Sequence, residues 1–254
     1  MKISFIGSGN VATHLAVAFC AAGAGIHQVW SRNAEHAAAL AGRVGAEART
    51  LEALEGCPVT SDVYILAVSD DALYELAPHL HLGDALVLHT SGATSLQLLQ
   101  GVSSRYGVLW PPYSFVRDVA VDYGSLPFCI EGNSAATESD IRSLAQMITE
   151  HIYTADTAQR NALHLAAVFA NNFVNGLYGI AQQVCRDHEV PFEILYPIIL
   201  ATAQRSQWGD VRGQITGPAV RRDEKTLARQ LQMLSHSPES QEVYRMMTRL
   251  IQQL

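Results

Sequence analysis

The sequence predicts an α/β protein in which a doubly wound parallel sheet is followed by an all-α domain. Three observations support this prediction. Strand-like and helix-like segments alternate over residues 1–154, an order that is typical of a parallel sheet with helices on both faces. No strand pattern is found over residues 155–254, where long helical segments prevail. A glycine-rich turn joins the first strand to the first helix, as nucleotide-binding sheets require.

The predicted strands of the first half are short apolar runs that end at turn residues. In chain order they cover residues 2–6, 26–30, 63–68, 84–89, 106–110, 128–131 and 151–154. Helices are expected over residues 12–22, 33–42 and 139–150, and also after Ser69-Asp70-Asp71, which is a good helix start. We therefore predict a Rossmann-type domain over residues 1–154.

The second half has the pattern of four helices. They cover residues 156–188, 192–208, 219–234 and 238–254, and the last two are joined by Ser235-His236-Ser237. The change of pattern falls near Ala155. We therefore predict a separate helical domain over residues 155–254.

A phosphate-binding loop is predicted directly after the first strand. Gly7 permits the tight turn, Gly9 lets a pyrophosphate approach the backbone, and Ala12 in the third glycine position lets helix and strand pack closely. The helix N-terminus offers free N–H groups and a positive dipole end to the phosphates. We expect the pyrophosphate contacts to come from Ser8, Gly9, Asn10 and Val11. The alternative is a glycine turn that only packs a βα unit.

The end of the second strand favours NADP over NAD. NAD-binding sheets place an acidic residue there to hold the ribose 2′-hydroxyl. This strand ends in Trp30-Ser31-Arg32-Asn33 and has no acid at that position. A hydroxyl and a guanidinium suit a 2′-phosphate, so we expect Ser31 and Arg32 to bind it. Alternatively, Arg32 is a solvated surface residue.

Two further strand ends carry small polar residues. Ser69 lies in Val68-Ser69-Asp70, and Ser91 lies in His89-Thr90-Ser91-Gly92. Ligands of such sheets lie beyond the carboxyl ends of the strands, so both serines are candidates for the nicotinamide ribose and amide. Helix N-capping would explain Ser69 and Asp70 equally well.

A long uncharged helix is the most unusual feature of the second half. Residues 161–185 contain no Asp, Glu, Lys or Arg, so we expect this helix to be largely buried, in the core or against a partner subunit. Its polar residues fall on one stripe at 100° per residue: His164, Asn171, Asn175, Tyr178 and Gln182. The stripe predicts a binding cleft, or else polar groups satisfied by the other domain's backbone.

Three residues of this stripe are the predicted catalytic group: His164, Asn171 and Asn175. Because the pKa of histidine lies near neutrality, His164 could donate the proton that accompanies hydride delivery. A structural histidine is the alternative. Arg221, in Thr216-Gly217-Pro218-Ala219-Val220-Arg221-Arg222-Asp223, is the candidate for a substrate anion. Alternatively, Asp223 caps a helix that begins at Glu224, and the arginines simply precede it.

Composition excludes several classes of protein. The 254 residues carry a net charge of −7 and only two lysines, Lys2 and Lys225, so a nucleic-acid partner is not expected. Four well-separated cysteines and the lack of a signal peptide predict free thiols and a cytoplasmic location. Polar residues interrupt the uncharged helix, so no membrane span is expected. No metal site is expected either.

Several motifs together resemble a bacterial family that joins a Rossmann-like domain to a helical domain of unknown function. They are GSGNVA at 7–12, HTSG at 89–92, Trp110-Pro111 with Phe115, Leu126-Pro127-Phe128 with Ile130-Glu131, LHLAAVFANNFVN at 163–175 and TGPAVRRD at 216–223. Members of that family are often described as NADP oxidoreductases. The layout is also similar to pyrroline-5-carboxylate reductase, deazaflavin-dependent NADP oxidoreductase, ketopantoate reductase and the β-hydroxyacid dehydrogenases. This resemblance implies a homodimer formed through the helical domain.

One departure from these relatives affects the mechanism. Ketopantoate reductase and the β-hydroxyacid dehydrogenases use a lysine on or near the long helix, whereas this chain has no lysine between Lys2 and Lys225. His164 could replace it, or the substrate could be an already protonated imine, as in pyrroline-5-carboxylate reductase. We therefore predict an NADP-dependent oxidoreductase acting on a small carbonyl or imine, which could carry a carboxylate. The alternative is a non-catalytic NADP(H) sensor or scaffold dimer.

Overall fold

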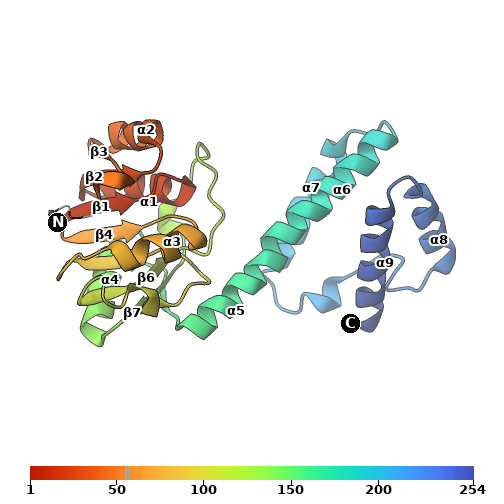
Figure 1. The fold of residues 1–254 in the computed structure, drawn as a ribbon. Helices are drawn as coiled ribbons and strands as arrows, with labels where there is room; N and C mark the ends of the chain where they lie inside the picture. The colour runs from red at the N-terminus through yellow and green to blue at the C-terminus, as the bar shows by residue number, and fades with distance from the viewer. Residues whose placement is uncertain (55, 57) are drawn as a thin grey trace. The chain divides into compact units, whose positions relative to one another are not determined.

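The computed structural model describes residues 1–54, 56 and 58–254 of the chain (Figure 1). It divides into two compact units, Met1–Val168 and Phe169–Leu254. The last strand ends at Thr154 and the following helix begins at Thr157, so the change of secondary structure lies where the sequence pattern changes. The assignment of the two functional domains at Ala155 stays a prediction.

The first unit contains one sheet with the order β3-β2-β1-β4-β5-β6-β7-β8. The strands are β1 Lys2–Ile6, β2 Gly25–Ser31, β3 Glu47–Thr50, β4 Val63–Leu66, β5 Leu86–His89, β6 Arg105–Trp110, β7 Phe128–Gly132 and β8 Ile152–Thr154. The strand order reverses between β1 and β4, which is the topological switch point of a doubly wound sheet. The predicted fold class is confirmed.

The sheet is parallel from β3 to β6, whereas β7 runs antiparallel to β6 and parallel to β8. The parallel direction predicted for the sheet is therefore wrong only between β6 and β7. The physical reason lies in the connection: residues 111–127 contain only a short 3-10 turn, Tyr123–Ser125. A parallel strand requires a crossover, usually helical, whereas a connection that stays at one end of the sheet brings the chain back antiparallel.

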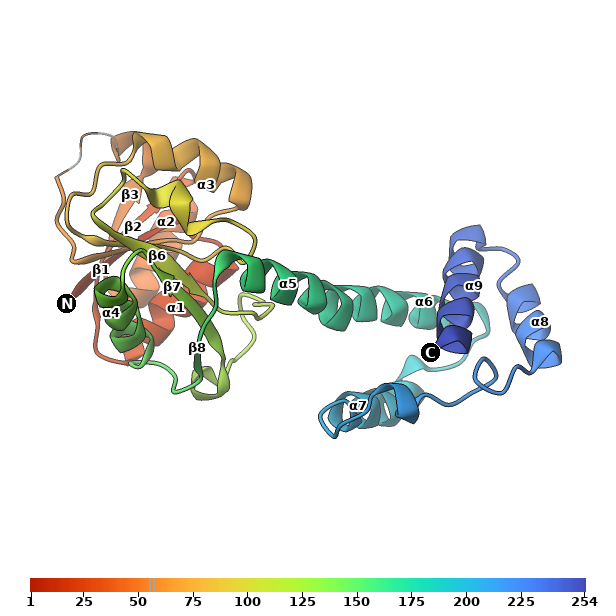
Figure 2. The same cartoon turned by 90° about the horizontal axis from the view of Figure 1, so that it is seen from below.

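Helices cover both faces of the sheet (Figures 1 and 2). They are α1 Asn10–Ala21, α2 Ala34–Val44, α3 Asp70–Leu76 and α4 Ala135–Ala145, with 3-10 turns at Leu51–Ala53, Ala77–His79 and Leu96–Leu99. Ser69 caps α3 as expected, since its side chain accepts from the Ala72 N–H. Helix α4 begins earlier than predicted because the Ser134 side chain caps it by accepting from the Thr137 N–H.

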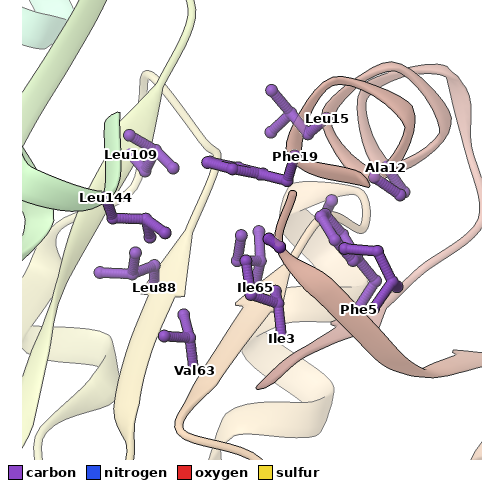
Figure 3. Close-up of a cluster of buried hydrophobic side chains, with 14 of the residues drawn as sticks. Ile3, Phe5, Ala12, Leu15, Phe19, Val63, Ile65, Leu88, Leu109 and Leu144 are labelled. Carbon is purple, nitrogen blue, oxygen red and sulfur yellow. The ribbon is translucent and has the colours of Figure 1, made fainter. Parts of the chain in front are cut away.

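Apolar alternation along the strands builds a core on each face of the sheet. In β4, Val63 and Ile65 belong to one cluster, while Tyr64 and Leu66 belong to the other, as the period of two requires. Figure 3 shows the first cluster, in which residues of α1 and α4 meet the sheet: Ile3, Phe5, Ala12, Leu15, Phe19, Val63, Ile65, Leu88, Leu109 and Leu144. Burial on both faces explains why these strands are continuous apolar runs.

The helix predicted over residues 156–188 is present, but its middle part is π-helical rather than α-helical. It consists of α5 Thr157–Ala167, a π-helical segment Val168–Phe173 and α6 Val174–Asp187. A capping box starts it: the Asp156 side chain accepts from the Gln159 N–H, and the Gln159 side chain accepts from the Asp156 N–H. A π turn takes up more residues than an α turn.

The second unit continues with α7 Tyr196–Arg205, α8 Glu224–Met233 and α9 Pro238–Gln253, and with 3-10 turns at Phe192–Leu195 and Arg212–Gln214. Helix α8 begins later than the predicted residue 219. The Asp223 side chain caps it by accepting from the Thr226 N–H, and Arg222 just before it has a φ of 52°, which α-helical geometry does not allow.

The uncharged segment 161–185 contains no buried side chain in the single chain, and every residue of it is described. Burial in the protein's own core, the first of the two expectations, is therefore wrong. Burial against a partner subunit stays a prediction. None of the described helices is long and apolar enough to span a membrane. Cys20, Cys129 and Cys185 are free thiols, whereas Cys57 lies outside the described residues.

Candidate cofactor-binding site

A cavity of about 520 Å³ opens at the carboxyl ends of the parallel strands in the first unit. Its lining comes from the segments that follow β1, β2, β3, β4 and β5. All nine residues predicted to bind the cofactor line it: Gly7, Ser8, Gly9, Asn10, Val11, Ser31, Arg32, Ser69 and Ser91. The cavity spans the switch point between β1 and β4, where such sheets bind their ligands.

Gly7 is required by the backbone that surrounds it. Its φ is +118°, and a Cβ at this position would lie 2.2 Å from the Ala67 carbonyl oxygen. The chain therefore turns out of β1 directly against the end of β4. No other residue type meets both conditions without distortion.

At Gly9, in contrast to Gly7, neither the backbone conformation nor the surrounding protein requires a glycine. Its φ is −75° and it is the N-cap of α1, so any residue could adopt this backbone. A Cβ on Gly9 would meet nothing within 4 Å, because it would point into open space at the loop. The first N–H groups of α1 have no intrahelical acceptor, so this cradle suits a pyrophosphate.

The ends of β1 and β2 are joined through two serines. The Ser8 hydroxyl donates to Ser31 Oγ at 2.8 Å, and the Asn33 N–H also donates to Ser31 Oγ, at 3.3 Å. Arg32 is exposed and forms no salt bridge among the described residues. Its guanidinium is thus available to a phosphate at the rim of the cavity.

The loop of residues 115–117, here called the Arg117 loop, was not predicted to belong to the site. It is hydrogen-bonded to the phosphate-binding loop and to α1. Asn10 Nδ2 donates to the Phe115 carbonyl at 3.0 Å, and Arg117 Nη2 donates to the Ser8 carbonyl at 3.4 Å. His14 Nε2 donates to the Val116 carbonyl at 2.9 Å. The Asn10 side chain is therefore used within the protein, which leaves its backbone N–H for the ligand. The sequence offers no local signal for Arg117.

The two serines at the later strand ends have structural partners as well as cavity positions. Ser69 Oγ accepts from the Ala72 N–H at 3.4 Å, which is the capping alternative. Ser91 Oγ donates to Thr94 Oγ1 at 2.9 Å and accepts from the Thr94 N–H at 3.0 Å. Both serines line the cavity, so helix or turn formation and ligand contact are compatible here.

A buried ionic group supports the turn that carries Ser91. Arg160 is fully buried, pairs with Glu131 and donates to the Thr94 carbonyl at 2.9 Å. Nearby, burial and then the Arg160 charge lower the pKa of His89 from 6.5 to about 3. The Ser91 N–H donates to His89 Nδ1 at 3.2 Å, so the neutral ring keeps its proton on Nε2. These charged and titratable residues were missed, because buried pairing is invisible in a single sequence.

His164, the predicted acid, lies on α5 in the first unit and is exposed. Its ring is 6.1 Å from the Trp110 ring, measured between centroids. Trp110 in turn lies against Gly92, where a Cβ would come within 2.6 Å of the indole. His164 is thus near the segment that follows β5, but it does not line the cavity of about 520 Å³.

Asn171 and Asn175 lie in the second unit and are brought together. Asn175 Nδ2 donates to Asn171 Oδ1 at 3.4 Å, and both residues are exposed. Asn171 lies in the π-helical segment and Asn175 in α6. The single stripe that the sequence predicts at 100° per residue stays a prediction.

Arg221 lies in the turns before α8 and is exposed. The pKa of Asp223 is lowered mainly by its hydrogen bonds to Thr226, with a smaller contribution from the Arg221 charge. The structure therefore shows Asp223 as the cap of α8 and the arginines before that helix. An anion-binding role for Arg221 stays a prediction.

The residues around the cavity fit NADP. The glycine cradle leaves room beside α1, the helix N-terminus supplies donors, and Arg32 has no acidic partner among the described residues. No acidic residue follows β2 directly. Ser31 and Arg32 would hold the 2′-phosphate, and Gly9, Asn10 and Val11 would hold the pyrophosphate.

Comparison with known proteins identifies two family domains. Residues 2–91 match the family described as NADP oxidoreductase, coenzyme F420-dependent, and residues 126–251 match a domain of unknown function, DUF2520. No match was found among curated proteins. A crystal structure from Bacteroides fragilis, titled as that of a "putative NADP oxidoreductase", is 34% identical, with a TM-score of 0.92 over 100% of this chain and 98% of that one.

Two more distant structures share the fold. A reductive aminase from Aspergillus terreus, in complex with NADPH and ethyl levulinate, is 16% identical with a TM-score of 0.72 over 99% of this chain and 92% of its own. A pyrroline-5-carboxylate reductase from Coxiella burnetii is 16% identical with a TM-score of 0.58 over 95% of this chain and 97% of its own. The chain therefore belongs to a family of NADP-dependent oxidoreductases that joins the coenzyme F420-dependent type of NADP oxidoreductase domain to DUF2520.

Proposed function

We propose that this enzyme transfers a hydride between NADPH and a small carbonyl or imine substrate, which could carry a carboxylate, and that an imine is the better substrate. One observation carries the proposal: all nine residues expected at the cofactor line one cavity at the switch point of the sheet. NADPH, when bound, supplies the hydride. The chain's own residues bind and orient NADPH, and they bind the charged group of the substrate and supply its proton.

The substrate-side roles are assigned to four residues. His164 would donate a proton to a carbonyl oxygen, Asn171 and Asn175 would hydrogen-bond the substrate, and Arg221 would bind an anionic group. The exposed imidazole beside Trp110 and the paired amides of Asn171 and Asn175 support these roles. An imidazole suits proton donation near neutral pH.

The preference for an imine rests on what the long helix does not carry. There is no lysine between Lys2 and Lys225, so the lysine that serves as the acid for carbonyl reduction in ketopantoate reductase and the β-hydroxyacid dehydrogenases is missing. A protonated imine already bears its proton and needs only a hydride at carbon. Among the structural neighbours, a reductive aminase and two pyrroline-5-carboxylate reductases are proteins whose names indicate C=N chemistry.

The test is a turnover screen of the NADPH-loaded protein with keto acids, aldehydes and cyclic imines. We expect imine reduction. His164→Ala should lower carbonyl reduction roughly 10²-fold and spare imine reduction, because only the carbonyl needs a protein acid. Asn175→Ala should lower both, while Asn161→Ala on α5 serves as the control. If both site variants retain full turnover, the proposed site is wrong. Tight NADPH binding without turnover on any substrate would favour the sensor instead.

We further propose that the enzyme is a homodimer formed through its helical unit. Among residues 169–254, all of which the structure describes, the buried apolar residues are Ala219, Leu227 and Leu234. Large apolar side chains are exposed instead: Phe169, Phe173, Leu177, Val190, Ile194, Tyr196, Ile198, Leu200, Trp208, Val211, Val220, Met233, Met246, Leu250 and Leu254. An isolated chain rarely leaves so much apolar surface in water.

The helical unit also contains an apolar cavity of about 460 Å³ between its own helices. It is lined by residues of α6, α8 and α9, among them Leu177, Ile180, Met233, Val243 and Met247. Obligate homodimer interfaces resemble a domain core cut in half. A second copy of the same helices is therefore the expected occupant of this surface.

A further inference from the structure

A second basic side chain stands beside Arg32 at the cavity. His36 lines the same cavity as Ser31, Arg32 and Asn33. It lies in the first turn of α2 and is exposed. The sequence pattern at the end of β2 predicts only Ser31 and Arg32 as ligands of the 2′-phosphate.

Local structure holds His36 at this place. The Asn33 side chain caps α2 by accepting from the His36 N–H at 3.0 Å, and the Asn33 N–H donates to Ser31 Oγ at 3.3 Å. These two bonds join Ser31, Asn33 and His36 in the turn that also contains Arg32, at the end of β2. His36 and Arg32 line the same cavity from that turn.

The position of His36 favours an anionic ligand. The N-terminal turn of a helix carries the positive end of the dipole, and Arg32 adds a full positive charge. A bound phosphate with a charge near −2 would be attracted to both, and an opposite charge at close range favours the imidazolium form of a histidine.

We propose that His36 is a second ligand of the 2′-phosphate and that it takes up a proton when NADPH binds. His36 then makes the preference for NADPH over NADH stronger as the pH falls toward the range in which histidine titrates. This inference concerns cofactor selection and does not depend on which substrate is reduced.

Other charges near α2 are accounted for. Glu47 and Arg49 on β3 pair with each other, Arg43 in the last turn of α2 pairs with Asp118, and His14 on α1 is hydrogen-bonded to Val116 and Tyr123. Glu35 on α2 and His27 on β2 do not line the cavity, whereas Asp70 and Glu75 of α3 do. NADH meets the same two acids as NADPH, so the parallel measurement with NADH accounts for them.

The test is calorimetric binding of NADPH and NADH in two buffers of different ionisation enthalpy at pH 7, which counts protons. His36→Gln should weaken NADPH binding roughly three- to tenfold and leave NADH binding unchanged. The number of protons taken up on NADPH binding, minus the number taken up on NADH binding, should be smaller for this variant than for the wild type. His36→Lys should restore NADPH affinity without restoring proton uptake, because lysine is charged throughout. His79→Gln, an exposed histidine elsewhere, is the matched control.

Arg32→Asp, measured in parallel, separates two kinds of failure. It should weaken NADPH binding at least tenfold more than NADH binding. If Arg32→Asp lowers both equally, the 2′-phosphate is not bound at this turn and the role of His36 falls with it. If Arg32→Asp behaves as expected but His36→Gln changes neither selectivity nor proton number, then only the assignment of His36 is overturned. Equal losses for both cofactors in His36→Gln would also overturn it.

Discussion

Three glycines differ in whether their backbone conformation, or the space around a hypothetical Cβ, requires a glycine. Gly7 combines a positive φ with a hypothetical Cβ 2.2 Å from the Ala67 carbonyl oxygen, Gly23 has a positive φ of +88° but open space, and Gly9 has an ordinary φ and open space. Only Gly7 is needed twice over by the protein itself. We expect Gly9 to be needed only for the close approach of a ligand to the backbone.

Alanine substitutions should therefore give three different results. Gly23→Ala should cost about 1 kcal/mol of unfolding free energy from backbone strain alone. Gly7→Ala should cost roughly 3 kcal/mol or more, because overpacking adds to strain. Gly9→Ala should leave stability almost unchanged yet weaken NADPH and NADH binding at least tenfold. Denaturant unfolding and calorimetry measure the two quantities. A large stability loss for Gly9→Ala would contradict the cradle.

His89 makes stability depend on pH. Its pKa is lowered from 6.5 to about 3 in the folded protein, so the unfolded chain binds a proton that the folded chain rejects between these values. The contribution is fully present above pH 6.5 and is lost as the pH falls toward 3, by up to about 1.4 kcal/mol per pH unit. His89→Asn should flatten this slope in denaturant titrations, while His151→Asn, at an exposed site, should not. If the unfolding free energies of wild type and His89→Asn change equally with pH, His89 is not the source of the pH dependence.

At the scale of elements, packing and pairing decided what the sequence pattern left open. Strand β3 was not predicted, because Glu47–Thr50 has a polar sequence and lies at the edge of the sheet beside β2 alone. The direction of β7 follows from its connection rather than from its own residues. The π-helical segment of the long helix cannot be seen in hydrophobic periodicity either, since it changes the rotation between residues rather than their type.

The Arg160–Glu131 pair ties α5 to β7 and to the turn that carries Ser91. Glu131→Gln keeps the side-chain shape and removes the charge, which leaves a fully buried guanidinium without its counter-ion. We expect a loss of roughly 2–3 kcal/mol in unfolding free energy. Asp140→Asn, which breaks the exposed Arg105–Asp140 pair, should cost less than about 1 kcal/mol. Similar losses for both variants, measured by denaturant unfolding, would show that burial does not strengthen the Arg160 contact.

At the scale of the whole molecule, the two units differ in how many of their apolar side chains are exposed to solvent. The first unit buries an apolar cluster on each face of its sheet, whereas the helical unit leaves many of its large apolar residues exposed in the single chain. Such a unit gains little free energy from its own core. Its stability is therefore expected to depend on a second copy.

Sedimentation should accordingly give about twice the 27.6 kDa of one chain. Leu200→Glu places a charge at an exposed apolar position of α7 and should shift the equilibrium toward monomer with a lower thermal midpoint, because a charge is costly to bury. Gln232→Glu introduces the same charge at an exposed polar position of α8 and should change neither. A wild-type monomer at micromolar concentration would rule out the dimer.

The sequence by itself determined the doubly wound half, the glycine loop and nine of the residues that line the cavity at the switch point. These follow from local rules: strand ends, turn chemistry and helix starts act over a few residues, and the switch point of the sheet gathers them. Only the tertiary structure decided the reversal of β7, the contact of the Arg117 loop with the phosphate-binding loop, and the buried Arg160–Glu131 pair. Each of these joins residues through space or through helix geometry, and composition and spacing along the chain carry no record of such contacts.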